Sequence, residues 1–324
     1  MSYVAPANNG TTAQGAINYA TEYSRALSQM FPYQLNFGAL YSTPNNNRYR
    51  WVNAKTIEIP SISTTGRVDA DRDTVAFAQR NYDNAWETKT LSNERKWSTL
   101  VHPMDIDQTN MVTTIANITQ VFNEEQKFPE MDAYTISELY SKWILTKNPR
   151  TQETHSADTT VLTTSNILSV FDDMMLKMDN AMVPANGRIL YATFEALQLL
   201  KEAQGISRQM DITSGPNAID RRVNRLDQVQ IIGVPATLMK TAYDFTVGYA
   251  PRDNAGQVNL FLVHPLAVIT PVSYTFSRLD APNALSEGKY VYYEESFEDV
   301  FILNKKSDAL QFNITEGSAT TTTE

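Results

Sequence analysis

The sequence predicts an α+β fold, because it contains both strand-like and helix-like segments. Residues 55–60 alternate polar and apolar side chains, as a half-buried strand does. Apolar residues recur at spacings of three and four, which places them on one face of a helix; they are Met111, Ile115, Ile118 and Phe122. Residues 260–263 form a short apolar run that is typical of a buried strand.

The composition is that of a globular protein. The 324 residues are 42% hydrophobic and 19% charged, which excludes disorder of the whole chain. The absence of cysteine removes disulfides, thiolate nucleophiles and zinc–cysteine sites. No stretch approaches the roughly 18 uninterrupted apolar residues that indicate a membrane span, and we expect neither a signal peptide nor contact with a membrane. The net charge of −9 argues against tight DNA binding, which usually requires a basic face.

Residues 1–50 are predicted to form an extended arm. The first 20 residues contain no charged side chain and are rich in Asn, Thr, Ala and Gly, so they do not resemble the start of a compact domain. The charged residues of the arm are Glu22, Arg25, Arg48 and Arg50. We expect the arm to be ordered only where a partner supplies a surface.

A protruding β-hairpin is predicted within residues 51–100. Its first strand covers residues 55–60, and its second strand lies within residues 83–100, which are rich in aromatic residues and Thr. The polar segment 61–81, with Gly66, would join them. An ordinary surface β-meander is the alternative.

The middle of the chain is predicted to be mainly helical. A long helix covers residues 104–143, with an interruption at Pro129 and a resumption at Met131. We expect its Met and aromatic stripe to be core rather than a cofactor site. After a polar linker over residues 147–164, Ser165 is the expected N-cap of a helix that runs through Leu168, Phe171, Met175 and Met178.

The remaining segments alternate between strands and a further helix. Gly187 is expected to turn the chain into a strand over residues 188–192, and Thr193 to cap a helix over residues 194–204 that ends at Gly205. A loop over residues 205–220 follows. Further strands are predicted at residues 229–232, 260–263, 289–293 and 300–303, and the tail is expected to be disordered.

No catalytic, cofactor-binding or metal-binding residue is predicted. The three histidines, His102, His155 and His264, are far apart in the sequence, and His264 is expected to be structural. The motif of Asp69, Asp71 and Asp73 resembles the start of a calcium loop, but the required Gly and Glu are replaced by Thr74 and Arg80. We therefore expect a solvated loop there.

An acidic cluster near the end of the chain is the only feature that suggests an enzyme. Glycoside hydrolysis needs two carboxylates that converge across a sugar, and local spacing does not show convergence. For this cluster, a solvated face or a face that forms salt bridges between subunits is the preferred interpretation. Its members are Glu294, Glu295, Glu298 and Asp299.

Several segments, in the correct order, resemble those of one protein family. Residues 105–110 and 128–134 resemble the start and the interruption of its long spine helix, and residues 183–191 resemble its VP-x-x-GR-x-LY segment. Similar matches occur at residues 231–235, 258–269 and 298–306. The family that these segments resemble is the HK97-type major capsid proteins of siphophages that infect Gram-positive bacteria. The resemblance covers residues 51–314, but Asn93-Glu-Arg-Lys96 departs from the Asp-Arg-Gly that often precedes the spine helix.

The resemblance implies a non-enzymatic capsid subunit with a defined order of segments. These are an N-arm (1–50), an extended E-loop hairpin (51–100), a peripheral domain with the spine helix (101–162), an axial domain (163–258), a return to the peripheral domain (259–314) and a disordered tail (315–324).

The implied partners are further copies of the chain. Such subunits form hexamers and pentamers of an icosahedral virion shell, which is assembled in the host cytoplasm and encloses double-stranded DNA without reading its sequence. A separate scaffold protein and a portal are also expected, since the strand pattern begins already at Lys55. Whether decoration proteins bind outside is left open.

Three other functions remain as alternatives. An encapsulin nanocompartment shell has the same fold and would contain protein cargo instead of DNA. A carbohydrate-active enzyme is suggested only by clusters of acidic residues and by aromatic residues that are expected to be exposed. A tail-tube protein or adhesin would be nearly all β, which the helices predicted over residues 165–204 contradict.

Two expectations about the shell follow from the same residues. Deletion of residues 1–20 should impair assembly but not folding of the subunit. Covalent crosslinks, which in some members join an E-loop lysine to a neighbour's asparagine, are not expected. No lysine lies between Lys55 and Lys89, so the projecting part of the hairpin offers only Arg67, Arg72 and Arg80.

Overall fold

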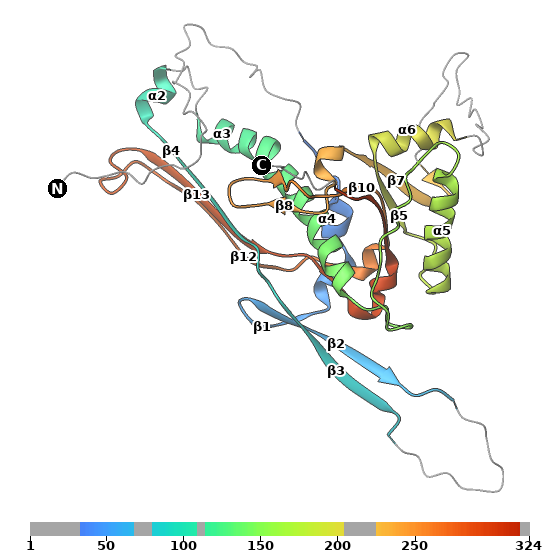
Figure 1. Ribbon diagram of the computed structural model, residues 1–324. Helices are drawn as coiled ribbons and strands as arrows, with labels where there is room; N and C mark the ends of the chain where they lie inside the picture. Colours follow the sequence, from blue (N-terminus) through green and yellow to red (C-terminus); the bar gives the residue numbers. More distant parts are fainter. Residues whose placement is uncertain (1–32, 68–79, 109–113, 204–224, 318–324) are drawn as a thin grey trace, which may run out of the picture.

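The computed structural model describes residues 33–67, 80–108, 114–203 and 225–317 (Figure 1). Most of the predicted arm, the three-aspartate motif, Met111 and Gly205 lie outside these ranges.

The predicted mixture of helices and sheets is confirmed. The helices are α1 (Gly38–Tyr41), η1 (Pro44–Asn47), α2 (Pro103–Gln108), α3 (Ile115–Phe122), the π-helical η2 (Asn123–Lys127), α4 (Phe128–Leu145), α5 (Ile167–Asn180), α6 (Phe194–Glu202), η3 (Ala236–Leu238), η4 (Pro265–Ala267) and η5 (Asn304–Ala309). The strands are β1 (Arg50–Asn53), β2 (Thr56–Thr64), β3 (Tyr82–Thr90), β4 (Glu94–Val101), β5 (Ile189–Thr193), β6 (Arg225–Leu226), β7 (Val229–Val234), β8 (Tyr243–Asp244), β9 (Ala250–Pro251), β10 (Gln257–Val263), β11 (Val268–Ile269), β12 (Val272–Asp280), β13 (Tyr290–Glu298), β14 (Phe301–Ile302) and β15 (Leu310–Thr315).

The body of the molecule is built on a five-stranded sheet with the order β15-β10-β5-β7-β6. β5 and β7 are parallel and are connected through α6, whereas the other pairs are antiparallel. Gly233 on β7 lets α6 approach closely, because a Cβ atom there would lie 2.7 Å from Leu197 and Phe194.

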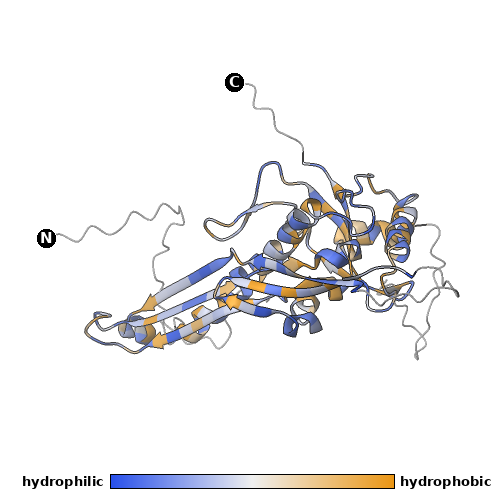
Figure 2. Ribbon diagram, turned by 90° about the horizontal axis from the view of Figure 1, so that it is seen from below, coloured by the Kyte–Doolittle hydropathy of each residue, from blue (hydrophilic) through white to orange (hydrophobic). Residues whose placement is uncertain are grey.

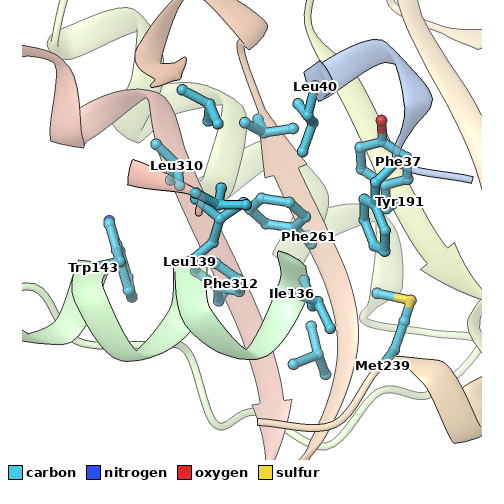
Figure 3. Packing of buried hydrophobic residues seen from close by; sticks show 14 of the residues in the cluster. Phe37, Leu40, Ile136, Leu139, Trp143, Tyr191, Met239, Phe261, Leu310 and Phe312 are labelled. Carbon is cyan, nitrogen blue, oxygen red and sulfur yellow. The ribbon is translucent and has the colours of Figure 1, made fainter. Parts of the chain in front are cut away.

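Alternation along the central strands places apolar side chains on both faces of this sheet. Phe261 and Val263 on β10 face one core together with Ile136, Leu139 and Trp143 of α4 (Figure 3). Leu260 and Leu262 face the opposite core, which contains Phe171 and Met178 of α5 and Leu200 of α6. The sheet is therefore covered by α4 on one face and by α5 and α6 on the other, as buried strands require.

Two long ribbons extend from this body (Figure 1). One is the sheet β1-β2-β3, and the other is the sheet β12-β13-β4. Hydrophilic and hydrophobic residues are interspersed along their strands (Figure 2). The predicted hairpin is confirmed as β2 and β3, but residues 83–100 do not form one strand. The chain leaves β3 after Thr90, because Leu91 is buried and the Ser92 N–H donates to Asp299 Oδ2 at 2.9 Å. The next strand, β4, therefore belongs to another sheet, where it pairs with β13.

The predicted interruption at Pro129 is wrong in detail. The helix continues from α3 through the π turn η2 into α4, which already begins at Phe128. Proline lacks an N–H and its ring crowds the preceding turn, and a widened turn accommodates both without ending the helix. The stripe of α3 is not core: no α3 residue is buried, and Phe122 instead stacks on Trp97 of β4 with ring centroids 3.9 Å apart.

The two predicted caps differ in outcome. Thr193 caps α6 as predicted, since its hydroxyl accepts from Ala196 N–H at 3.2 Å. Ser165 is not the cap of α5; Asn166 occupies that position, and its Oδ1 accepts from Thr163 N–H at 2.7 Å instead of from the helix. Gly187 makes the predicted turn with a φ of +89°.

Candidate functional site

The β2–β3 hairpin is firmly attached to the body at its base. Ile57 and Leu91 are buried in a cluster with Ile269, Phe297 and Phe301. Lys89 Nζ lies 2.7 Å from Glu87 Oε1 and 2.9 Å from Asn304 Oδ1, so Lys89 belongs to the base as expected. Further along, Lys305 Nζ donates to the Ile62 carbonyl at 2.7 Å, and the ribbon then extends away from the body (Figure 1).

One face of this hairpin carries exposed apolar side chains among polar ones. Pro60 pairs with Trp86, and Thr64 pairs with Tyr82, so these residues and Ile62 share a face. Ile62 is 67% exposed, Tyr82 58% and Trp86 45%. A two-stranded hairpin is at best marginally stable alone, and grouped exposed apolar side chains usually mark an interaction site. This hairpin face is the candidate functional site, and its exposed apolar side chains suit contact with another molecule.

Three members of the acidic cluster, Glu294, Glu298 and Asp299, line one cavity, and two of them pair with cations of the same chain. Asp299 is buried and accepts from Lys142 Nζ at 2.8 Å and from Tyr134 Oη at 3.0 Å. Glu294 accepts from Lys127 Nζ at 2.9 Å. The expectation of a solvated or intersubunit face is therefore wrong for these two residues, because α4 and η2 supply cations within the same chain.

Glu298 provides a test of the electrostatics of this cluster. Burial raises the pKa of its carboxyl above the usual value. The folded state then binds a proton more tightly than the unfolded state, so this residue's contribution to stability falls as pH rises through its folded pKa. We expect Glu298→Gln to melt higher than the unmodified protein at neutral pH, and this difference to disappear in acid. Thermal unfolding across pH measures it, and a pH-independent difference would contradict it.

The histidines have separate structural environments. His264 Nδ1 accepts from Leu266 N–H at 3.2 Å and Nε2 lies 3.2 Å from the Asn186 carbonyl, so its expected structural role is confirmed. His155 stacks on Trp143, and His102 accepts from Met104 N–H. Across residues 33–67, 80–108, 114–203 and 225–317, no group of three or more His, Asp or Glu side chains is arranged to hold a metal ion.

A buried carboxylate that the sequence did not reveal attaches the start of the described chain to α4. Asp132 is fully buried and accepts from Asn36 N–H at 2.8 Å and from Phe37 N–H at 3.1 Å, while Tyr33 donates its hydroxyl. Burial raises the pKa of Asp132 despite these donors. The only sequence signal was an acid between the apolar residues Met131 and Ala133. Its partners are 95 to 99 residues away, so spacing could not predict them.

Solved structures with a similar fold come from phage capsids. No family model and no curated protein sequence matches the chain. A structure from Mycobacterium phage Che8 is 13% identical with a TM-score of 0.60, and covers 92% of this chain and 98% of its own. The mature capsid of bacteriophage PhiM1 (11% identity, TM-score 0.65) covers 91% of both chains, and the capsid of Cyanophage P-SCSP1u (11% identity, TM-score 0.63) covers 98% of this chain and 100% of its own.

The chain has the phage capsid fold.

Three of the sequence segments that resemble capsid proteins lie together in the central sheet of this capsid fold. Residues 183–191 lead into β5, residues 231–235 end β7, and residues 258–264 form most of β10. β10 and β7 are the two neighbours of β5 in the central sheet. These three segments are therefore adjacent in the central sheet, although they are far apart in the sequence. In the described residues, no helix of this capsid fold has both the length and the apolar character needed to cross a membrane.

Proposed function

We propose that this protein is the major capsid protein of a phage, a non-enzymatic subunit that assembles with its own copies into an icosahedral shell around double-stranded DNA. The observation that carries the proposal is the similarity to phage capsid structures over more than nine-tenths of the chain and of those chains. The exposed apolar face of the hairpin supports it, because a shell subunit needs surfaces that are covered only after assembly.

On this proposal each segment has a place in an HK97-type subunit. The β2–β3 hairpin would be the E-loop, and α3, η2 and α4 together would be the spine helix. α5, β5, α6 and β7 would belong to the axial domain, and the ribbon β12-β13-β4 to the peripheral domain. The proposed boundary at residues 258 and 259 lies inside β10, so the two domains would share the central sheet.

Repetition explains how such contacts could hold a shell. Each contact recurs in every copy, so individually weak interfaces act together through multivalency. Closed symmetry turns a repeated surface pair into a finite particle. The virion would then be the protein's location, with a scaffold and a portal as further partners during assembly in the host cytoplasm.

Negative-stain microscopy of the purified protein tests the proposal. We expect closed shells, or curved sheets if a scaffold is needed to complete closure. A protein that stays monomeric at high concentration, with and without candidate scaffold proteins, would overturn it. Protein cargo in place of DNA in particles from infected cells would indicate a nanocompartment.

The shell is expected to be free of covalent crosslinks. Lys55 and Lys89 lie at the base of the hairpin, where Lys55 is 3.7 Å from Glu94 and Lys89 contacts Glu87. The described projecting part carries Arg67 and Arg80, whose guanidinium groups stay protonated and are poor nucleophiles. Particles boiled in detergent should therefore run as one band at the monomer mass of 36.5 kDa. A ladder of multimers that resists boiling would contradict this.

A further inference from the structure

A cavity of about 350 Å³ lies between the base of the β2–β3 hairpin and the body. Its apolar lining includes Ile59, Ile269 and Leu303. Its charged lining consists of Arg48, Lys305 and Lys306 and of Glu87, which is already paired with Lys89. Lys305 Nζ donates to the Ile62 carbonyl at 2.7 Å, and Lys306 Nζ donates to the Leu266 carbonyl at 3.0 Å. In the described part of the chain none of these three cations forms an ion pair.

A buried acceptor also lines this cavity. Asn45 is 2% exposed, and its Nδ2 donates to the Leu266 carbonyl at 2.6 Å. Its Oδ1 has no hydrogen-bond partner among the described residues. A buried acceptor is stable only when a donor reaches it. The cavity thus suits an occupant that carries three groups: an apolar group, a hydrogen-bond donor and a carboxylate.

The loop between β12 and β13 presents these three groups in consecutive residues. Leu285 is 97% exposed, Ser286 carries a hydroxyl and peptide N–H groups flank it, and the Glu287 side chain is 80% exposed. The loop has a defined shape, because Asn283 Oδ1 accepts from Leu285 N–H at 2.8 Å and from Ser286 N–H at 2.9 Å. Glu287 lies 3.2 Å from Lys289, but such an exposed pair is weak and can be exchanged.

The loop cannot reach the cavity of its own chain. The Ser273 hydroxyl donates to the Ala54 carbonyl, so β12 begins beside the base of the hairpin. The strand then runs for nine residues away from it, which is roughly 30 Å (Figure 1). The only copy of the loop available to the cavity is therefore on another molecule.

We propose that the cavity is an intersubunit socket that receives the loop of a second copy of this chain. Leu285 would fill the apolar part, Glu287 would pair with Arg48 and Lys305, and a donor of the loop would meet Asn45. The contact joins two different surfaces, and such head-to-tail contacts continue from copy to copy into rings or lattices. This inference rests on the proposed function, since it assigns one contact of the proposed shell.

Exchanging the charges of Arg48 and Glu287 tests whether these two residues pair between copies of the chain. Arg48→Glu and Glu287→Arg should each lower the particle yield at least tenfold, with unchanged melting of the monomer, because each places like charges together. The double variant should restore the yield. Failure of the double variant to assemble better than either single variant would overturn the pairing.

Disulfide trapping tests the position directly, because the natural chain has no cysteine. Ser61 lines the cavity, so oxidised Ser61→Cys/Leu285→Cys protein should form disulfide-linked chains of many copies. Ser61→Cys/Val247→Cys is the matched control, since Val247 is 80% exposed outside the loop, and it should not. Equal linking in both would overturn the proposal.

The two proposals fail differently. A wild-type protein that forms no particle under any condition contradicts the capsid function, whereas intact particles without trapping in the Ser61→Cys/Leu285→Cys variant contradict only the socket. In the absence of particles, oxidation at high protein concentration still decides the socket, because the linked chains should appear only with the Leu285→Cys pairing.

Discussion

Trp143→Ala should destabilise the folded subunit by about 3–5 kcal/mol, the usual cost of removing a buried aromatic side chain. Trp143 is 1% exposed and lies between α4 and the central sheet. Its ring centroid is 4.9 Å from that of His155 and 5.0 Å from that of Phe312, and its Nε1 donates to the Ser307 carbonyl at 3.1 Å. The substitution would remove these contacts, leave a cavity and deprive the Ser307 carbonyl of this hydrogen-bond donor.

Denaturant unfolding of the monomer measures this loss. Leu145→Ala is the matched control on the same helix, because Leu145 is 81% exposed, and it should change stability by less than about 0.5 kcal/mol. Since a domain of this kind is stable by only about 5–15 kcal/mol, the Trp143 variant should lose a large share of its stability. Equal effects of both substitutions would mean that α4 does not pack on the sheet as described.

Trp86→Ala should prevent assembly while leaving the monomer folded. Trp86 is 45% exposed on the hairpin, and its ring lies 4.1 Å beneath the Arg50 guanidinium. Loss of an exposed cation–π contact costs the monomer only about 0.5–1 kcal/mol. An interface tryptophan typically contributes about 2 kcal/mol or more to binding, so its loss should weaken the affinity of each contact more than about tenfold. The same loss of affinity recurs in every copy of the shell.

Particle yield by sedimentation, measured beside monomer melting, separates the two effects. Leu176→Ala is the control. Leu176 is 56% exposed on α5, so this substitution removes an exposed apolar side chain from a different surface. We expect normal yield from this control. Normal particles from Trp86→Ala would show that the hairpin face is not buried in the shell.

Several features were predictable because short-range physics decides them. Thr193 caps α6 through a donor three residues away, and Gly187 turns the chain because glycine alone adopts its φ of +89° without strain. The apolar run at residues 260–263 is buried on both faces, and it forms part of β10, an interior strand of the five-stranded sheet.

Other features depended on partners that are remote in the sequence. Asp299 was interpreted as part of a solvated or intersubunit face, but Lys142 lies 157 residues earlier and neutralises it in the same chain. The division of residues 83–100 into β3 and β4 depends on a bond from Ser92 to that same Asp299, 207 residues later. No local pattern predicts such contacts, because chain spacing does not determine which elements meet.

The sequence by itself therefore determined the α+β class, the hairpin, most helices and strands and the resemblance to capsid proteins, since these follow from periodicity, caps and residue order. Only the tertiary structure decided which polar residues are buried and which apolar ones remain exposed. Asp132 and Asn45 became interior groups, whereas Trp86 and Leu285 stayed in solvent. Burial depends on the side chains that long-range packing brings together, so the candidate contact surface and the socket became visible only after folding.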